Sequence, residues 1–261
     1  MLVLTLSAIG HAQATDEIAK SLQALKQGRQ DGGDLVELER HRSDPRTIPA
    51  LKEAFSRGGP KRKMQELAGT LLRVGEKADV YFDFLAAFVK EALADRTPYW
   101  ISYDPSGHLV NGGFSPEFEN WCRAHDEDLK AAAELQYSRG FDVWMLAEAK
   151  DARAVPLFVE GLDSPNHLVI SYSVLGLAQL QITSALPKIE KRMESLAIDA
   201  NLVIAAQLPW FSSVEAYRMM ERFVPNANVR EFMRRQVAVG QGMARPTPVV
   251  KEQDDPLRKK N

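Results

Sequence analysis

The sequence predicts an all-α protein built from stacked helical hairpins, that is, an α-solenoid. A short phrase recurs along the chain: Asp44-Pro-Arg-Thr-Ile-Pro-Ala-Leu returns as Asp151-Ala-Arg-Ala-Val-Pro-Leu-Phe, and a weaker copy, Ile182-Thr-Ser-Ala-Leu-Pro-Lys-Ile, follows 31 residues after the second. Each copy is followed by apolar residues spaced for one face of a helix. A period of this size is typical of solenoids, in which each unit buries its apolar face only against its neighbours.

Each phrase has the features of a helix start. Asp44, Asp151 and Thr183 stand in capping positions, and the proline that follows is tolerated because the first-turn amides have no intrahelical acceptor. After the second copy, an apolar stripe ends at Gly161, and the next helix is expected to contain Leu168, Val169, Tyr172, Leu175, Leu177 and Leu180. In that helix Gly176 and Ala178 are small enough to allow close helix packing.

The other elements follow from apolar spacing and turn residues. Asp16 to Lys26 is expected to be one helix, Gly28 to Gly33 a break, and Asp34 the cap of a short helix through Leu38. Further helices are expected at Lys77–Leu93, Pro116–Ala124, Glu127–Tyr137 and Phe141–Ala149. Residues 95–120 do not fit the repeat, and their Asp104-Pro-Ser-Gly turn predicts a small hairpin that closes at His108 to Val110.

These residues resemble the short bacterial form of the HEAT repeat. Asp151 to Gln181 covers one unit, Asp44 to Gly75 covers another, and Ile182 to Val224 is a degraded third. The resemblance implies a right-handed α-solenoid of HEAT-like hairpins with one irregular aromatic-rich insertion. We therefore divide the chain into N-terminal repeats (15–94), the insertion (95–120), C-terminal repeats (121–239) and a disordered tail (240–261).

Composition narrows the function classes. The formal net charge is −2, so nothing global favours nucleic acid as a partner. No apolar run reaches the roughly 18 residues that a membrane span needs. Cys122 is the only cysteine, which excludes an internal disulfide.

The N-terminus has the pattern of a secretory signal peptide. An apolar stretch from Leu2 to Ile9 is followed by Ala12-Gln-Ala14, a small-x-small cleavage site, and mature protein would begin at Thr15. The region before the apolar stretch lacks the Lys or Arg that is usual in a signal peptide, which allows a start upstream of Met1. The alternative is an apolar N-terminal element that packs on the body. We expect export to the periplasm or beyond.

Two surfaces are candidate binding sites. In the insertion, Trp100, Tyr103, His108 and Asn111 could contact a sugar, a peptide or another helix, or the rings could instead fill a groove of the solenoid. The second candidate is the basic cluster Lys61, Arg62 and Lys63, with Arg57 nearby, which could bind an anionic partner or be an ordinary solvated face.

A catalytic site is a weaker alternative. Cys122 and His125 are spaced i, i+3 on an expected helix and could form a thiol and base pair, but we expect a partly buried thiol near an acidic helix start instead. His41 and His167 are isolated and expected at the surface or at a helix terminus. No metal-ligand set and no cofactor motif is recognised.

We therefore expect a non-catalytic, exported scaffold that binds a protein or peptide through its helical-repeat surface. The resemblance also permits an enzyme on the same scaffold. A lyase would use a groove residue such as His108 or His125, whereas a DNA glycosylase would need a basic groove that the charge balance does not favour. A structural spacer within a larger assembly is the third alternative.

Overall fold

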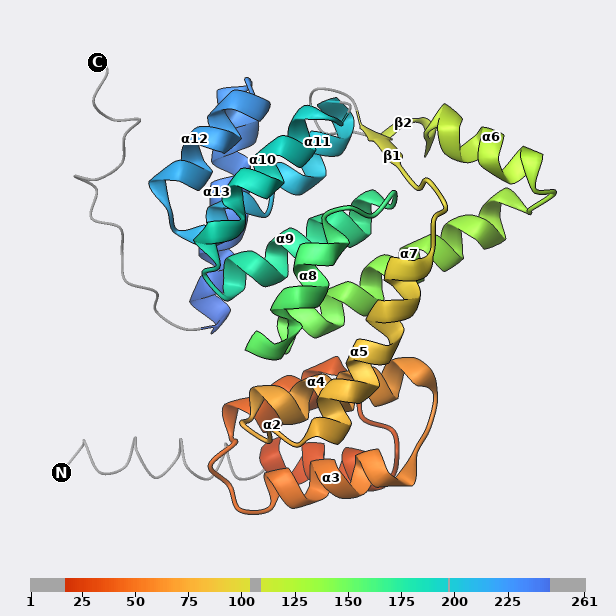
Figure 1. The fold of residues 1–261 in the computed structure, drawn as a ribbon. Coiled ribbons are helices and arrows are strands. Elements are labelled where there is room, and N and C mark those ends of the chain that lie inside the picture. The colour runs from red at the N-terminus through yellow and green to blue at the C-terminus, as the bar shows by residue number, and fades with distance from the viewer. Residues whose placement is uncertain (1–16, 104–108, 197, 245–261) are drawn as a thin grey trace. The chain divides into compact units, whose positions relative to one another are not determined.

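The computed structural model describes residues 17–103, 109–196 and 198–244, with the backbone alone for 101–103, 109–112, 198–200 and 237–244. Its elements are helices, apart from one two-stranded antiparallel hairpin (Figure 1). The predicted all-α class is thus confirmed. Within these ranges no helix is both long and apolar enough to cross a bilayer. The chain divides into two compact units between Ala87 and Phe88, inside helix α5.

The first unit holds a helix over residues 17–26, followed by α2 (Gly32–Arg40), α3 (Thr47–Arg57), α4 (Lys61–Arg73) and the start of α5 (Asp79–Ala94). Helix α4 packs against both α2 and α3. The core consists of leucines from all of these helices, among them Leu25, Leu38, Leu51, Leu67, Leu71 and Leu85. On α3, Phe55 stands edge-on to Tyr81 and Phe84 of α5, with ring centroids 5.0 and 5.5 Å away.

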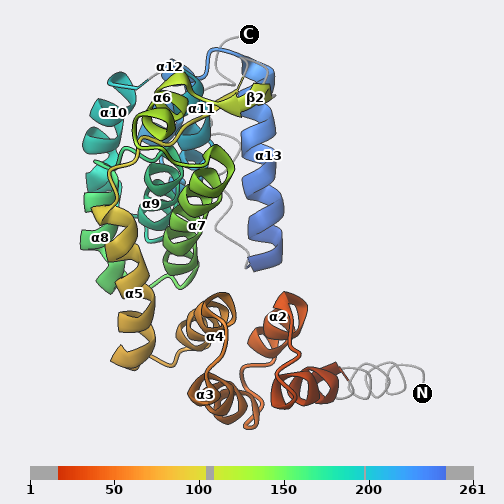
Figure 2. The same ribbon diagram turned by 90° about the vertical axis from the view of Figure 1, so that its right-hand side faces the viewer.

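The second unit continues from the end of α5 to α13. Its elements in chain order are β1 (Ile101–Tyr103), β2 (Leu109–Phe114), α6 (Pro116–Ala124), α7 (Leu129–Glu148), the 3-10 turn η1 (Ala152–Ala154), α8 (Val155–Gly161), α9 (His167–Gln179), η2 (Thr183–Ala185), α10 (Leu186–Glu194), α11 (Ile198–Ala205), η3 (Leu208–Phe211), α12 (Val214–Phe223) and α13 (Ala227–Ala244). Helix α9 is the centre of this unit and packs against α7, α8 and α11 (Figures 1 and 2). Nearly all of its side chains are buried.

The recurring phrase forms the same local structure in its first two copies. The Asp44 carboxylate accepts a hydrogen bond from the Arg46 amide at 2.9 Å and also binds the Arg46 guanidinium. Asp151 repeats these bonds with the amide and guanidinium of Arg153. The third copy has Ile182 in place of the aspartate, and its 3-10 turn has no side-chain cap.

Two consecutive helical hairpins, η1–α8–α9 and η2–α10–α11, keep the same order of elements and the same spacing. Each element of the first hairpin begins 31 residues before its counterpart in the second. Within the first of these hairpins the helices lie very close together. A Cβ added at Gly176 of α9 would lie 2.5 Å from the Phe158 ring of α8, which confirms the expected role of this glycine in close packing.

Three details differ from the sequence expectation. Helix α2 begins at Gly32, because Asp31 is its cap and Asp34 bonds back to the Asp31 amide in a reciprocal capping box. The two helices expected between Glu127 and Ala149 are one helix, α7, whose interior Gly140 faces the side chain of Leu168 on α9. Helix α13 extends to Ala244, into the segment expected as a tail.

Candidate functional site

The predicted aromatic site lies in the second unit, around the hairpin. Strands β1 and β2 pair antiparallel, with Ile101 opposite Phe114 and Tyr103 opposite Leu109. Trp100 immediately precedes β1 and is half-buried. Tyr103 lies in β1 and Asn111 in β2, but their side chains, like the whole of His108, are outside the described part of the chain.

Most rings of the insertion that the structure describes belong to the core. Tyr99 is 3% exposed and Phe118 is fully buried, and the two rings meet edge-on at 5.0 Å. They pack with Cys122 of α6 and Leu168 of α9, while Phe114 and Trp121 lie partly buried at the edge of this cluster. Tyr99 and Phe118 are therefore core residues, whereas Trp100 is only half-buried.

His167, the first residue of α9, stacks against the Tyr99 ring of this cluster. The sequence placed it at a helix terminus or at the surface, and it is at the terminus but has no exposed surface. Its ring lies nearly parallel to those of Tyr99 and Trp100, with centroids 5.5 and 5.7 Å away. Its Nδ1 is 2.6 Å from the backbone carbonyl oxygen of Tyr99, so Nδ1 carries the proton and donates.

The surroundings of His167 keep its imidazole neutral. Burial lowers its pKa to about 4, although the bond to the Tyr99 carbonyl acts in the opposite direction. Among the described residues no group bonds Nε2. A neutral, enclosed imidazole of this kind fixes the insertion to α9, and it is closed to an external substrate.

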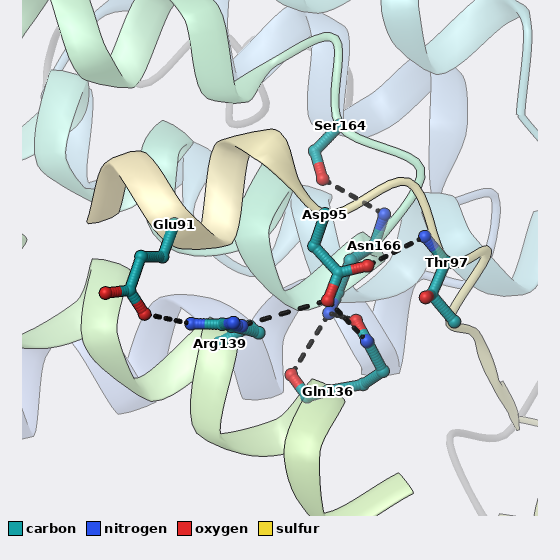
Figure 3. Close-up of polar contacts among 7 residues, drawn as sticks. All are labelled: Glu91, Asp95, Thr97, Gln136, Arg139, Ser164 and Asn166. Carbon is teal, nitrogen blue, oxygen red and sulfur yellow. Dashed lines mark hydrogen bonds and ion pairs between the residues drawn. The ribbon is translucent and has the colours of Figure 1, made fainter. Parts of the chain in front are cut away.

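A polar network links the end of α5 to α7 and to the start of α9 (Figure 3). Asp95, just after α5, accepts hydrogen bonds from the Thr97 amide at 2.9 Å and from Nε2 of Gln136 on α7 at 2.9 Å. The Asn166 side-chain amide then donates to both the backbone and the side-chain oxygen of Gln136 at 3.0 Å. Through these bonds the end of α5, helix α7 and the start of α9 are joined by buried and partly buried groups.

The network also includes a charged residue, Arg139, which lies near two carboxylates. Arg139 of α7 donates to Glu91 of α5 at 2.8 Å and lies 3.8 Å from Asp95 (Figure 3). Burial of the Asp95 carboxyl raises its pKa, but the bonds from Thr97 and Gln136 and the charge of Arg139 outweigh it, so the net pKa is below the usual value. The carboxylate is a fixed, ionised acceptor, which is a structural role.

The Cys122 and His125 pair does not form a thiol and base arrangement. Cys122 is 3% exposed, and burial together with the charges of Glu127 and Asp128 raises the pKa of its thiol. His125 stacks on Trp121 at 4.3 Å and places Nδ1 2.8 Å from the Trp121 carbonyl oxygen. A raised thiol pKa disfavours the nucleophilic thiolate.

The predicted basic cluster forms the first turn of α4, in the first unit. Lys63 is half-buried and donates from Nζ to the carbonyl of Gly28 at 2.8 Å. Arg62 forms an ion pair with Glu66, one turn along the same helix, at 3.3 Å. Lys61 is exposed. Lys63 thus links the first turn of α4 to the segment that precedes α2.

Beside Lys63 is a cleft of about 290 Å³. Its walls are the end of the helix over residues 17–26 and the Gly58-Gly59-Pro60 turn that leads into α4. Arg57 crosses from α3 and donates to the carbonyl of Lys26 at 2.7 Å and to that of Leu25 at 3.3 Å. Lys63 and Arg57 are the cations of the lining, and the lining includes no carboxylate.

Gln30 also lines this cleft and has an unusual environment. Its side chain is 8% exposed, and its Oε1 is buried with no hydrogen-bond donor among the described residues. A buried amide oxygen without a donor costs about 1–3 kcal/mol. Burial of Gln30 could not be predicted from the sequence, because the break from Gly28 to Gly33 indicates only a turn and the cleft forms by contact with α3 and α4.

The two predicted surfaces belong to different units, so they are separate candidate sites. In the described ranges no group of three or more His, Cys, Asp or Glu side chains is placed to hold a metal ion. Comparisons with protein-family models, with curated proteins and with solved structures find no match for this chain.

Proposed function

We propose that this chain is a non-catalytic binding scaffold for a protein or peptide, built as a right-handed HEAT-like α-solenoid. The observation that carries the proposal is the cleft of the first unit, where Arg57, Lys63 and Gln30, whose side-chain oxygen has no donor among the described residues, line one space of about 290 Å³. Convergent polar groups in a concave site are typical of ligand-binding positions.

The helical repeat supports the scaffold part of the proposal. The constant 31-residue spacing of η1–α8–α9 and η2–α10–α11 and the shared bonding of Asp44 and Asp151 are the features expected of repeated hairpins. A surface fixed by such packing loses little conformational entropy when a partner binds, and its affinity then comes from many modest contacts. In this proposal Trp100 and the rest of the insertion (Tyr103, His108 and Asn111) form a second contact surface.

The compartment is part of the proposal. We place the protein in the periplasm or outside the cell, on the basis of the apolar Leu2 to Ile9 stretch and the Ala12-Gln-Ala14 site. Fractionation of cells that express the natural gene tests this, together with N-terminal sequencing of the product. A cytoplasmic protein with an uncleaved N-terminus would contradict it and favour the intracellular enzyme alternatives.

The binding function is tested by affinity capture. The mature chain from Thr15 is immobilised and incubated with an extract of the envelope fraction, and the captured protein is identified and its affinity measured. Lys63→Glu should weaken capture at least about tenfold, because a charge that attracts the partner then repels it. Arg62→Glu is the matched control, since Arg62 does not line the cleft. Equal capture by wild type and Lys63→Glu would exclude the cleft as the binding surface.

A further inference from the structure

We propose that the cleft of the first unit binds the C-terminal carboxylate of a peptide chain, together with the last amide before it. This inference rests on the proposed function, since it names the chemistry of the partner at the same site. Its four contributing features are Arg57, Lys63, the start of α4 and the side-chain amide of Gln30.

Net charge at the cleft favours an anion. The end of the helix over residues 17–26 contributes about −0.5 charge and the start of α4 about +0.5, so the two helix ends offset one another. The two side-chain cations remain as the net charge of the lining. Arg57 and Lys63 use part of their donors on the carbonyls of Leu25, Lys26 and Gly28, and these bonds hold both cations in place.

The start of α4 gives the anion a directional contact. Pro60 is the N-cap residue, and its side chain cannot cap the helix as Ser, Thr, Asp or Asn would. The first intrahelical bond of α4 runs from the Met64 amide to the Pro60 carbonyl. An oxyanion at this end is favoured by the helix dipole, and the adjacent Gly58 and Gly59 leave open space where side chains would otherwise project.

Gln30 identifies the ligand as more than a simple ion. A lone anion would satisfy the cations but not the Oε1 of Gln30, which needs a hydrogen-bond donor. A primary amide offers one acceptor and one donor group, which is the complement of a peptide bond. A chain that ends in a carboxylate and carries a backbone N–H just before it offers an acceptor to the cations and a donor to Oε1.

The size of the cleft agrees with the end of a chain. Its volume of about 290 Å³ is at the lower limit of ordinary ligand pockets, which span roughly 300–1,000 Å³. An entire helix or folded domain cannot enter it. The terminal residues of an extended peptide can, with the remainder of the partner lying outside.

The test is an NMR titration of the full-length, ¹⁵N-labelled chain with four probes: N-acetyl-Ala-Ala, N-acetyl-Ala-Ala-amide, acetate and inorganic phosphate. N-acetyl-Ala-Ala should produce saturable shifts in the backbone amides of residues 58–64 and in the side-chain amide of Gln30. The amidated peptide and acetate should each bind about tenfold more weakly, because each lacks one of the two contacts. Equal binding by the amidated peptide, equal or tighter binding by acetate or phosphate, or no saturable shift with N-acetyl-Ala-Ala would each overturn the inference.

Substitutions separate a ligand contact from a structural one. Lys63→Met should weaken N-acetyl-Ala-Ala binding about tenfold, while Arg62→Met should leave it unchanged. Gln30→Met should also weaken binding, and the removal of Oε1 should not by itself lower the unfolding midpoint, because this oxygen has no donor to lose among the described residues. Loss of stability in Gln30→Met with unaltered binding would overturn the role of Gln30, and unaltered binding in Lys63→Met would overturn the site.

The titration and the capture experiment can fail separately. If the envelope partner is captured but N-acetyl-Ala-Ala does not bind, the scaffold function stands and the carboxylate inference is wrong. If the dipeptide binds and no partner is captured, the cleft is a carboxylate site and the proposed protein-binding function is wrong.

Discussion

The backbone carbonyl of Tyr99 accepts two hydrogen bonds from one residue, His167: one from its backbone amide at 3.0 Å and one from Nδ1 at 2.6 Å. Two segments that lie 68 residues apart in the chain are thereby fixed to each other at the start of α9. The imidazole is fully buried, and this burial, rather than the hydrogen bond, favours its neutral form. Burial therefore makes the stability of the second unit depend on pH.

We predict that acid destabilises the fold through His167. Its pKa is about 4 in the folded chain and 6.5 when unfolded, so the unfolded state binds the proton first. The free energy of unfolding should fall as the pH drops below about 6.5, by up to about 3 kcal/mol once the pH is below the folded pKa. Urea unfolding between about pH 7 and pH 4 measures this. His167→Asn should be less stable at neutral pH but lose less on acidification.

The matched control is His125→Asn, because His125 is exposed and stacks only at the surface on Trp121. Its acid dependence should follow that of the wild type. A pH dependence in His167→Asn as steep as that of the wild type would contradict the assignment to His167.

We predict that Asn166→Ala destabilises the chain more than an ordinary helix cap does. The Asn166 side chain accepts from the amides of Leu168 and Val169, and it also donates twice to Gln136 (Figure 3). Removing it deprives α9 of its cap and leaves the buried Oε1 of Gln136 without this donor, at a combined cost of about 2–4 kcal/mol. Chemical denaturation measures this.

A comparable cap lies on the surface and serves as the control. Asn226, before α13, accepts from the amides of Asn228 and Val229 but is exposed. Asn226→Ala should cost only about 1 kcal/mol. Equal losses for the two variants would show that the buried bonds to Gln136 contribute nothing to stability.

We predict that Gly176→Ala destabilises the α8–α9 hairpin. The added Cβ would lie 2.5 Å from Cε2 of Phe158, and overpacking of this kind costs about 1–3 kcal/mol. A thermal unfolding measurement should show a lower midpoint. The double variant Gly176→Ala with Phe158→Leu should recover part of the loss relative to the sum of the single changes, because the smaller side chain makes room for the methyl group.

Gly32→Ala is the control for this experiment, since nothing lies within 4 Å of its added Cβ and it stands at the start of α2. Its stability should change little. If Gly176→Ala were as well tolerated as Gly32→Ala, the close approach of α8 and α9 would be wrong.

We predict that Cys122 reacts slowly with thiol reagents in the folded protein. Its side chain is 3% exposed and its thiol pKa is raised, so both access and thiolate content are reduced. Labelling with a water-soluble disulfide reagent should be at least about a hundredfold slower than in urea-unfolded chain. Cys122→Ala should still bind N-acetyl-Ala-Ala like the wild type. Fast labelling under native conditions would revive a reactive role for the thiol.

The sequence predicted the helical class and the start of each hairpin, because these depend on neighbouring residues. Asp44 and Asp151 bond to amides two residues away, and Pro116 and Ala124 bound α6 as expected. The same reasoning placed the close contact at Gly176. The sequence predicted two helices where the structure has one, α7, because the packing of Gly140 against Leu168 on α9 cannot be read from the local pattern around residue 140.

The candidate sites depended on contacts that no local pattern contains. The sequence grouped Lys61, Arg62 and Lys63 by adjacency, whereas the fold brings Lys63 to the carbonyl of Gly28, 35 residues before it in the chain. Gln30 and His167 stand out only after burial removes their access to water, since in an extended chain water bonds both side chains. Local preferences therefore determined the helices, and only the tertiary structure decided which polar groups lost their solvent and which of them gained a partner in its place.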